Sequence, residues 1–230
     1  MFLPLHKKLS HIQEAVQMKN ATKILAALML VVLALSFTGC SSENGYEQVV
    51  NKYCSAVQKN DFNAMKSIID WDNLEKIAEL NGRDYDKKEM EENLKETLTD
   101  QYENLEYKFD KGFTVEHGQI KVLKDGYEDY SLKRLQKLAK LENEAEDADA
   151  TKFINDFVAN LKYVTVVKTN ITVKSKKDSS EKDKEEETFY TYCYKGKWYR
   201  NTSVLDYVVR ALNARERVAG TDDSGDDGWG

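Results

Sequence analysis

Residues 163–173 read YVTVVKTNITV, and residues 188–200 read TFYTYCYKGKWYR. Both stretches are rich in β-branched and aromatic residues, and the pair Lys195-Gly196 supplies a turn inside the second, so the sequence predicts three antiparallel strands. Between them, residues 174–187 contain five Lys and six Asp or Glu. So many charges cannot be buried, and we expect this segment to be a solvated hairpin tip.

Helical periodicity dominates the chain ahead of this sheet. Apolar residues recur at steps of three and four from residue 46 to residue 57, which predicts an amphipathic helix that stops near Asn60. Asp61 is placed to cap a second helix. Asp72, with Glu75 three residues later, forms a capping-box pattern for a third helix that ends near Gly82.

A fourth helix is expected to begin near Asp86, and the alternation at residues 105–109 then predicts a short strand. Residues 113–122 alternate around Gly118 and predict a small hairpin. The helical period returns in three further segments, which lie at residues 127–145, 153–161 and 204–212. Helices followed by a late antiparallel sheet indicate an α+β fold.

Two segments resemble exported lipoprotein domains of the cystatin-like or NTF2-like kind. Residues 53–62, YCSAVQKNDF, look like their opening helix, polar turn and second helix, and residues 194–199, YKGKWY, look like their closing hairpin. The resemblance implies N-terminal helices packed on a curved antiparallel sheet. The helical stretch at residues 127–160 is longer than the compact domains of this kind need, and we expect it to be a helical insertion.

Charge argues against nucleic acid as a partner. The chain has 34 Lys+Arg and 40 Asp+Glu, and four and one of these precede Cys40, so the remainder carries 30 against 39. A net charge of about −9 repels a polyanion.

An export signal is predicted near the N-terminus. Residues 24–37 form an uncharged run of 14 residues, which is shorter than the roughly 20 that a membrane-spanning helix needs. Lys19 and Lys23 precede it, as in secretory signals. Phe37-Thr38-Gly39-Cys40 resembles the lipobox of bacterial lipoproteins, which implies diacylglycerol on Cys40 and attachment to the extracytoplasmic side of the cell membrane. The alternative is an uncleaved signal anchor.

These features divide the chain into four parts. Residues 1–39 are expected to be the signal peptide, with translation starting at Met18 or with residues 1–17 as an extended basic entry region. Residues 40–45 are expected to be the lipidated cysteine and a short tether. A single α+β domain is expected over residues 46–213, and residues 214–230 are expected to be an acidic, disordered tail.

The sequence contains few candidates for catalytic or metal-binding residues. After Cys40 the chain has one histidine, His117, for which a position at a strand end competes with a role as a general base. Phosphate-binding glycine motifs and zinc-binding spacings are missing from the sequence, so no cofactor is expected. The aspartates of residues 222–227 suit calcium chemically but lack the EF-hand spacing, which favours a solvated tail.

Asp70, beside Trp71, is the single carboxylate that we consider as a base in an apolar pocket, the arrangement that isomerases of the NTF2-like fold use. A role as a helix cap is the stronger interpretation, so Asp70 is not assigned as a site. Tyr190, Tyr192 and Tyr194 share one face of their strand. This row would bind a sugar, peptide or protein if exposed, whereas a helix packed over it is the commoner arrangement.

Two thiols remain besides Cys40. Cys54 lies on the apolar face of the first helix and Cys193 lies on a strand, so both are expected to point into the space between helix and sheet. They form a disulfide or remain two separate buried thiols, and the sequence leaves both alternatives open.

The favoured function is a noncatalytic, lipid-anchored binding module with an envelope protein, peptide or glycan as its partner. The alternative is a small-pocket enzyme or small-molecule carrier of the NTF2-like kind, which the fold resemblance alone favours.

Overall fold

The computed structural model describes residues 43–110, 112–143, 145–201 and 203–222. Four helices come first, namely α2 (Tyr46–Lys59), α3 (Phe62–Lys66), α4 (Trp71–Leu80) and α5 (Lys87–Lys108). The middle of the chain contains β1 (Phe113–His117), β2 (Lys121–Leu123), the short 3-10 helix η1 (Glu128–Tyr130), α6 (Leu132–Leu138) and α7 (Ala148–Asn160). The last elements are β3 (Leu161–Ser175), β4 (Lys182–Tyr194), β5 (Lys197–Arg200) and α8 (Val204–Asp222).

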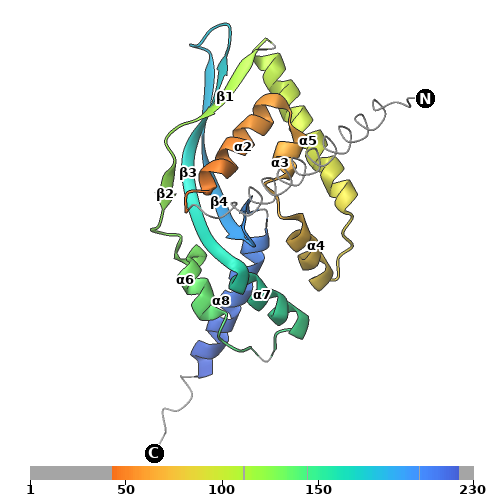
Figure 1. The fold of residues 1–230 in the computed structure, drawn as a ribbon, viewed down its shortest axis with the longest axis vertical. Helices are drawn as coiled ribbons and strands as arrows, with labels where there is room; N and C mark the ends of the chain where they lie inside the picture. Colours follow the sequence, from red (N-terminus) through yellow and green to blue (C-terminus); the bar gives the residue numbers. More distant parts are fainter. Residues whose placement is uncertain (1–42, 111, 144, 202, 223–230) are drawn as a thin grey trace, which may run out of the picture.

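The strands form one curled antiparallel sheet in the order β1-β3-β4-β5, with β2 also paired to β3 (Figure 1). This arrangement confirms the predicted α+β class, with N-terminal helices packed on the sheet. It also confirms the three late strands, and Lys195 and Gly196 both adopt the positive φ that their tight turn requires.

The β3–β4 hairpin is longer than predicted. β4 starts at Lys182, so much of the charged segment 174–187 is strand rather than loop. Its side chains are mostly exposed, as expected, and they pair across the strands instead of entering a core; the Lys168 and Glu186 side chains, for example, lie 2.5 Å apart. Strand pairing satisfies the backbone of residues 182–187 while their side chains stay mostly exposed.

The predicted hairpin at residues 113–122 is wrong in its pairing. β1 and β2 both pair with β3, at residues 171–175 and 166–168 respectively. They therefore lie one after the other along the same edge of β3.

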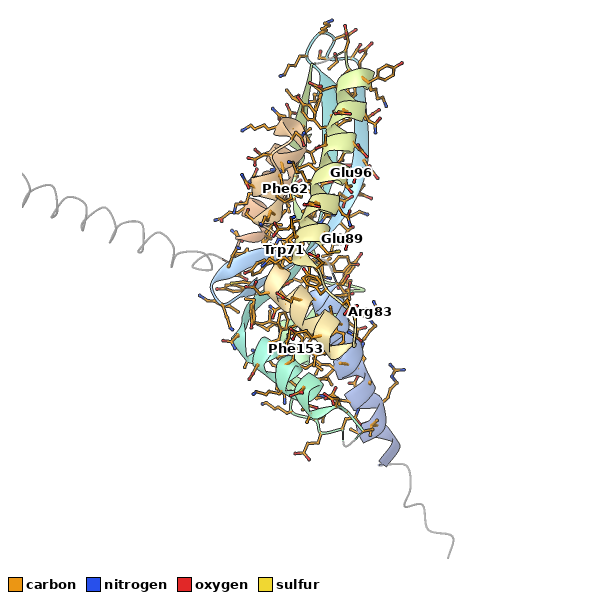
Figure 2. The ribbon with its side chains drawn as sticks, turned by 90° about the vertical axis from the view of Figure 1, so that its right-hand side faces the viewer. Phe62, Trp71, Arg83, Glu89, Glu96 and Phe153 are labelled. Atoms are coloured by element: carbon orange, nitrogen blue, oxygen red, sulfur yellow. The ribbon has the colours of Figure 1, made fainter. Side chains whose placement is uncertain are left out.

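Two hydrophobic cores lie on opposite faces of the sheet. The first joins α2, α3 and α5 to the face that carries Val167, Phe189 and Cys193. The second joins α6, α7 and α8 to the face that carries Tyr192. Figure 1 shows the first group of helices beside the upper half of the long strands and the second group at the lower end. In Figure 2, Trp71 lies near the middle of the molecule, between the end that carries α5 and the end that carries Phe153.

Two helices are longer than predicted. α5 continues to Lys108, so the strand expected at residues 105–109 is helix, because Leu98, Leu105 and Phe109 form one inward stripe while Tyr107 is 92% exposed. α8 continues to Asp222, beyond the predicted domain boundary at residue 213. The physical reason is Arg215, which is fully buried and held by Glu146 of the segment before α7.

Within the described ranges, no helix has both the length and the apolar character needed to cross a membrane.

Candidate binding cleft

An open cleft of about 1110 Å³ lies where β2, η1, α6 and the edge of β3 meet the turn that precedes α2. Val164, Thr165 and Val166 of β3 form part of its wall. β2 pairs with β3 only as far as Val166, so at Val164 and Thr165 the edge of the sheet lies in the cleft wall.

Tyrosines form the aromatic side of the cleft. The ring centres of Tyr127 and Tyr130 lie 5.9 and 4.8 Å from that of Tyr190. The Tyr130 hydroxyl donates a hydrogen bond to Asp206 Oδ1 at 2.9 Å. Burial, together with this carboxylate, raises the pKa of Tyr130 to about 12. The Tyr130 hydroxyl therefore stays neutral at physiological pH. Its hydrogen bond to Asp206 holds the side chain in a fixed orientation.

Cationic side chains of α6 and of the turn after it form the opposite side. Lys133, Lys137 and Lys140 line the cleft and are exposed. Arg134 also lines it, but its guanidinium forms a two-pronged ion pair with Glu216 of α8, at 3.0 and 2.8 Å. Glu216 thereby fixes Arg134 in place, whereas the three lysines remain available to a ligand.

The turn before α2 closes one end of the cleft through Glu43 and Asn44. Gly45, expected to belong to a flexible tether, is instead buried and caps α2. A Cβ atom at Gly45 would stand 1.9 Å from Trp198 Nε1, so only glycine fits against that ring. The ordered domain therefore begins before residue 46.

The tyrosine row of β4 is covered by helices, as the commoner arrangement predicted. Tyr192 is fully buried, and Phe157 of α7 stacks on Tyr194 with ring centres 4.8 Å apart. Tyr190 does not line the cleft itself, but its ring contacts Tyr127 and Tyr130, which do. The row is thus largely core, and only its Tyr190 end adjoins the cleft.

Asp70 is the N-cap of α4, and Asp72 does not hold that position, so the predicted capping box is wrong while the cap interpretation of Asp70 is confirmed. Asp70 is 3% exposed, and its Oδ2 accepts hydrogen bonds from Tyr192 at 2.9 Å and Asn73 at 2.7 Å. Desolvation raises the pKa of Asp70, although these hydrogen bonds oppose the shift. The cleft is not lined by Asp70, whose oxygens are already used in the core.

The cysteines are buried as expected, with Cys54 and Cys193 at 5% and 0% exposure. Cys54 is a free thiol, so a disulfide between these two residues is not formed. Desolvation raises the pKa of Cys54 to about 11, which keeps the thiol protonated and inert.

His117 lies at the end of β1, where its ring nitrogens contact the Gly118 carbonyl at 2.9 Å and Asn51 Oδ1 at 3.0 Å. Both contacts are to neutral groups, and they fit a structural role at a strand end. Among the described residues, no group of three or more His, Cys, Asp or Glu could hold a metal ion.

Several predictions fall outside the described residues. They are the signal at residues 24–37, the start at Met18, lipidation of Cys40 and the acidic tail from residue 223 onward.

Comparison with models of protein families, with curated proteins and with solved structures finds no match. The cleft itself was missed by reasoning from the sequence, because its walls come from five separate segments. The one local signal was the lysine spacing of residues 133, 137 and 140, which resembles the solvated face of any amphipathic helix.

Proposed function

We propose that this protein is a noncatalytic binding module, anchored by lipid on Cys40 to the extracytoplasmic face of the cell membrane, and that it holds its partner in the cleft. The cleft carries the proposal, because it combines exposed lysines of α6 and the turn after it with the aromatic side of Tyr127 and Tyr130. Aromatic and cationic groups around an open cleft suit recognition of another molecule.

A peptide or protein segment of the envelope is the partner class that the β3 edge favours. An extended segment can add to an exposed sheet edge through its main chain, with side chains received in neighbouring pockets. Val164 and Thr165 offer such an edge inside the cleft. The negative charge of the chain after Cys40 continues to argue against nucleic acid.

Absence of catalysis is proposed for a chemical reason. A base of the NTF2-like kind needs a carboxylate that faces a cavity. Asp70 has the apolar surroundings, but Tyr192 and Asn73 occupy its oxygens and the cleft does not reach it. The pairing supports a structural role for this carboxylate.

Lipid anchoring is tested with Cys40→Ala. We expect the wild-type protein to incorporate labelled fatty acid in its own cells and the variant to incorporate none, because the thiol is the attachment atom. The variant should also remain unprocessed at residue 39. Unchanged labelling of the variant contradicts the anchor.

The binding site is tested by placing a photo-crosslinking amino acid at Tyr127 in the anchored protein. The matched control is the same amino acid at Tyr107, which is 92% exposed on α5 and does not line the cleft. We expect a discrete adduct from position 127 and none of that mass from position 107. No adduct at 127, or the same adduct from both positions, contradicts the cleft as the binding site.

A further inference from the structure

Three lysines of α6 and of the turn that follows it are exposed to solvent. Lys133 and Lys137 are four positions apart, which places them on one side of the helix, and Lys140 lies in the turn just after the helix and lines the same cleft. The opposite side carries Leu135 and Leu138, which are buried in the second core. α6 is therefore fixed to the domain by its apolar side and presents its lysines outward.

The charge of this face is opposite in sign to the net charge of the chain after Cys40. The cleft is lined by five Lys or Arg and three Asp or Glu, whereas the chain after Cys40 carries 30 against 39. Lys124, exposed at the end of β2, adds to the α6 lysines. Charges interact over about 10 Å at 0.1 M salt, so the local sign rather than the net charge decides what this face attracts.

The anchor would place this face near a membrane. Three peptide units separate Cys40 from Glu43, and they span at most about 11 Å when extended. Glu43 lines the cleft, and Gly45 two residues later is packed against Trp198. A lipid on Cys40 thus leaves too little chain for the domain to turn the cleft far from the headgroups.

We propose that the lysine surface, defined as Lys124, Lys133, Lys137 and Lys140, docks on anionic phospholipid headgroups of the membrane that carries the anchor, and that the tyrosine side and the β3 edge of the cleft are left to the peptide partner. The proposal rests on the lipid anchoring proposed above. Lysines at a negatively charged membrane surface gain electrostatic attraction without needing a shaped pocket. Val122, an apolar side chain that is 45% exposed in the same cleft wall, is suited to the boundary between headgroups and acyl chains.

The proposal is tested with the chain from Ser41 to Gly230, which keeps every described residue and lacks the lipidated cysteine. Its binding to vesicles of pure phosphatidylcholine is compared with binding to vesicles that contain 30% phosphatidylglycerol, by co-sedimentation at 0.1 M salt. The test variant carries Lys133→Gln, Lys137→Gln and Lys140→Gln. The control carries Lys176→Gln, Lys182→Gln and Lys184→Gln, which change the net charge equally in the β3–β4 hairpin at the opposite end of the molecule from α6 (Figure 1).

We expect the unmodified chain to bind only the anionic vesicles. The α6 variant should need at least about tenfold more lipid for half-maximal binding, and the hairpin control should match the unmodified chain. Equal loss in both variants, or no preference for anionic vesicles, overturns the proposal. Because this chain lacks Cys40, the result is independent of the fatty-acid labelling test, so the lysine surface and the anchor can fail separately.

Discussion

At the scale of single residues, two positions carry constraints that their neighbours in sequence do not reveal. Gly45 lies against the indole of Trp198, 153 positions later, and Asp70 lies against the hydroxyl of Tyr192, 122 positions later. Both contacts lie beside the sheet, so they connect the first helices of the chain to its last strands. Each makes a prediction that a single substitution can test.

Gly45→Ala is expected to destabilise the fold. The added methyl group would overlap the Trp198 ring, and relieving that overlap by shifting the ring or the helix costs about 1–3 kcal/mol of unfolding free energy. The measurement is urea denaturation followed by far-UV circular dichroism. Gly118→Ala is the control, since the nearest atom there lies at an ordinary 3.7 Å. Equal midpoints for both variants would contradict the packing at Gly45.

Asp70 is expected to make stability depend on pH. Desolvation raises the pKa of Asp70 in the folded protein, so the folded chain binds this proton more tightly than the unfolded chain does. The resulting stabilisation is present below the unfolded pKa of about 3.9 and is lost as the pH rises through the raised pKa.

The measurement compares the wild type with Asp70→Asn at pH 4 and pH 8. Asparagine stays neutral and still caps a helix, so the wild type should lose stability relative to this variant between the two pH values. A difference that is constant, or that changes in the opposite direction, contradicts the raised pKa. Asp70→Ala should cost about 2–4 kcal/mol, because it removes the cap and leaves Tyr192 and Asn73 without their acceptor.

At the scale of elements, the second half of α8 is the part of a helix that the sequence did not predict. Its last two turns look like the start of an acidic tail, yet Arg215 is 1% exposed and makes four hydrogen bonds. They reach Glu146, Asn155 and the Ala139 carbonyl, which belong to the α6–α7 connection and to α7. Arg215 thus connects α8 to α7 and to the segment between α6 and α7.

Arg215→Ala is expected to cost about 3–5 kcal/mol, because removing one partner of a buried ion pair leaves the other charge uncompensated. Arg217→Ala is the matched control: Arg217 is exposed, and its Nε donates a hydrogen bond to the Asn213 carbonyl of its own helix. Thermal unfolding of both variants provides the comparison. A change of less than about 1 kcal/mol for Arg215→Ala would show that the pair is not needed for stability.

At the scale of the whole molecule, the two cores share the same strands. Val167 of β3 belongs to the first core, while Leu161 of β3 belongs to the second. β4 divides in the same way between Phe189 and Tyr192. Because both cores pack on β3 and β4, unfolding of one core would disrupt the strands on which the other core packs. The domain should therefore unfold as one unit.

This cooperativity is tested with one leucine from each core. Leu98→Ala in the first core and Leu205→Ala in the second should each lower stability by about 2–5 kcal/mol. In both variants, tryptophan fluorescence and far-UV circular dichroism should report one coincident transition. A second transition in either variant would indicate two independent units.

Local pattern was sufficient for much of the fold. Asp61 caps α3 as predicted, and α5 begins next to Asp86, where a helix was expected to begin. Alternation identified the long strands and the shared face of Tyr190, Tyr192 and Tyr194. These features follow from interactions between residues near in sequence, where the helical and strand periods are visible. The lipid anchor at Cys40 likewise follows from a local motif, and it stays a prediction.

Only the tertiary structure decided which of two aspartates caps α4, how β1 and β2 pair and where α8 ends. In each case a distant group made the difference, namely Tyr192 for Asp70, β3 for the two short strands and Glu146 for Arg215. The cleft is also of this kind, since its walls meet only after folding. A single sequence shows which residues can be buried or charged, but the contacts between distant segments exist only once the chain has folded.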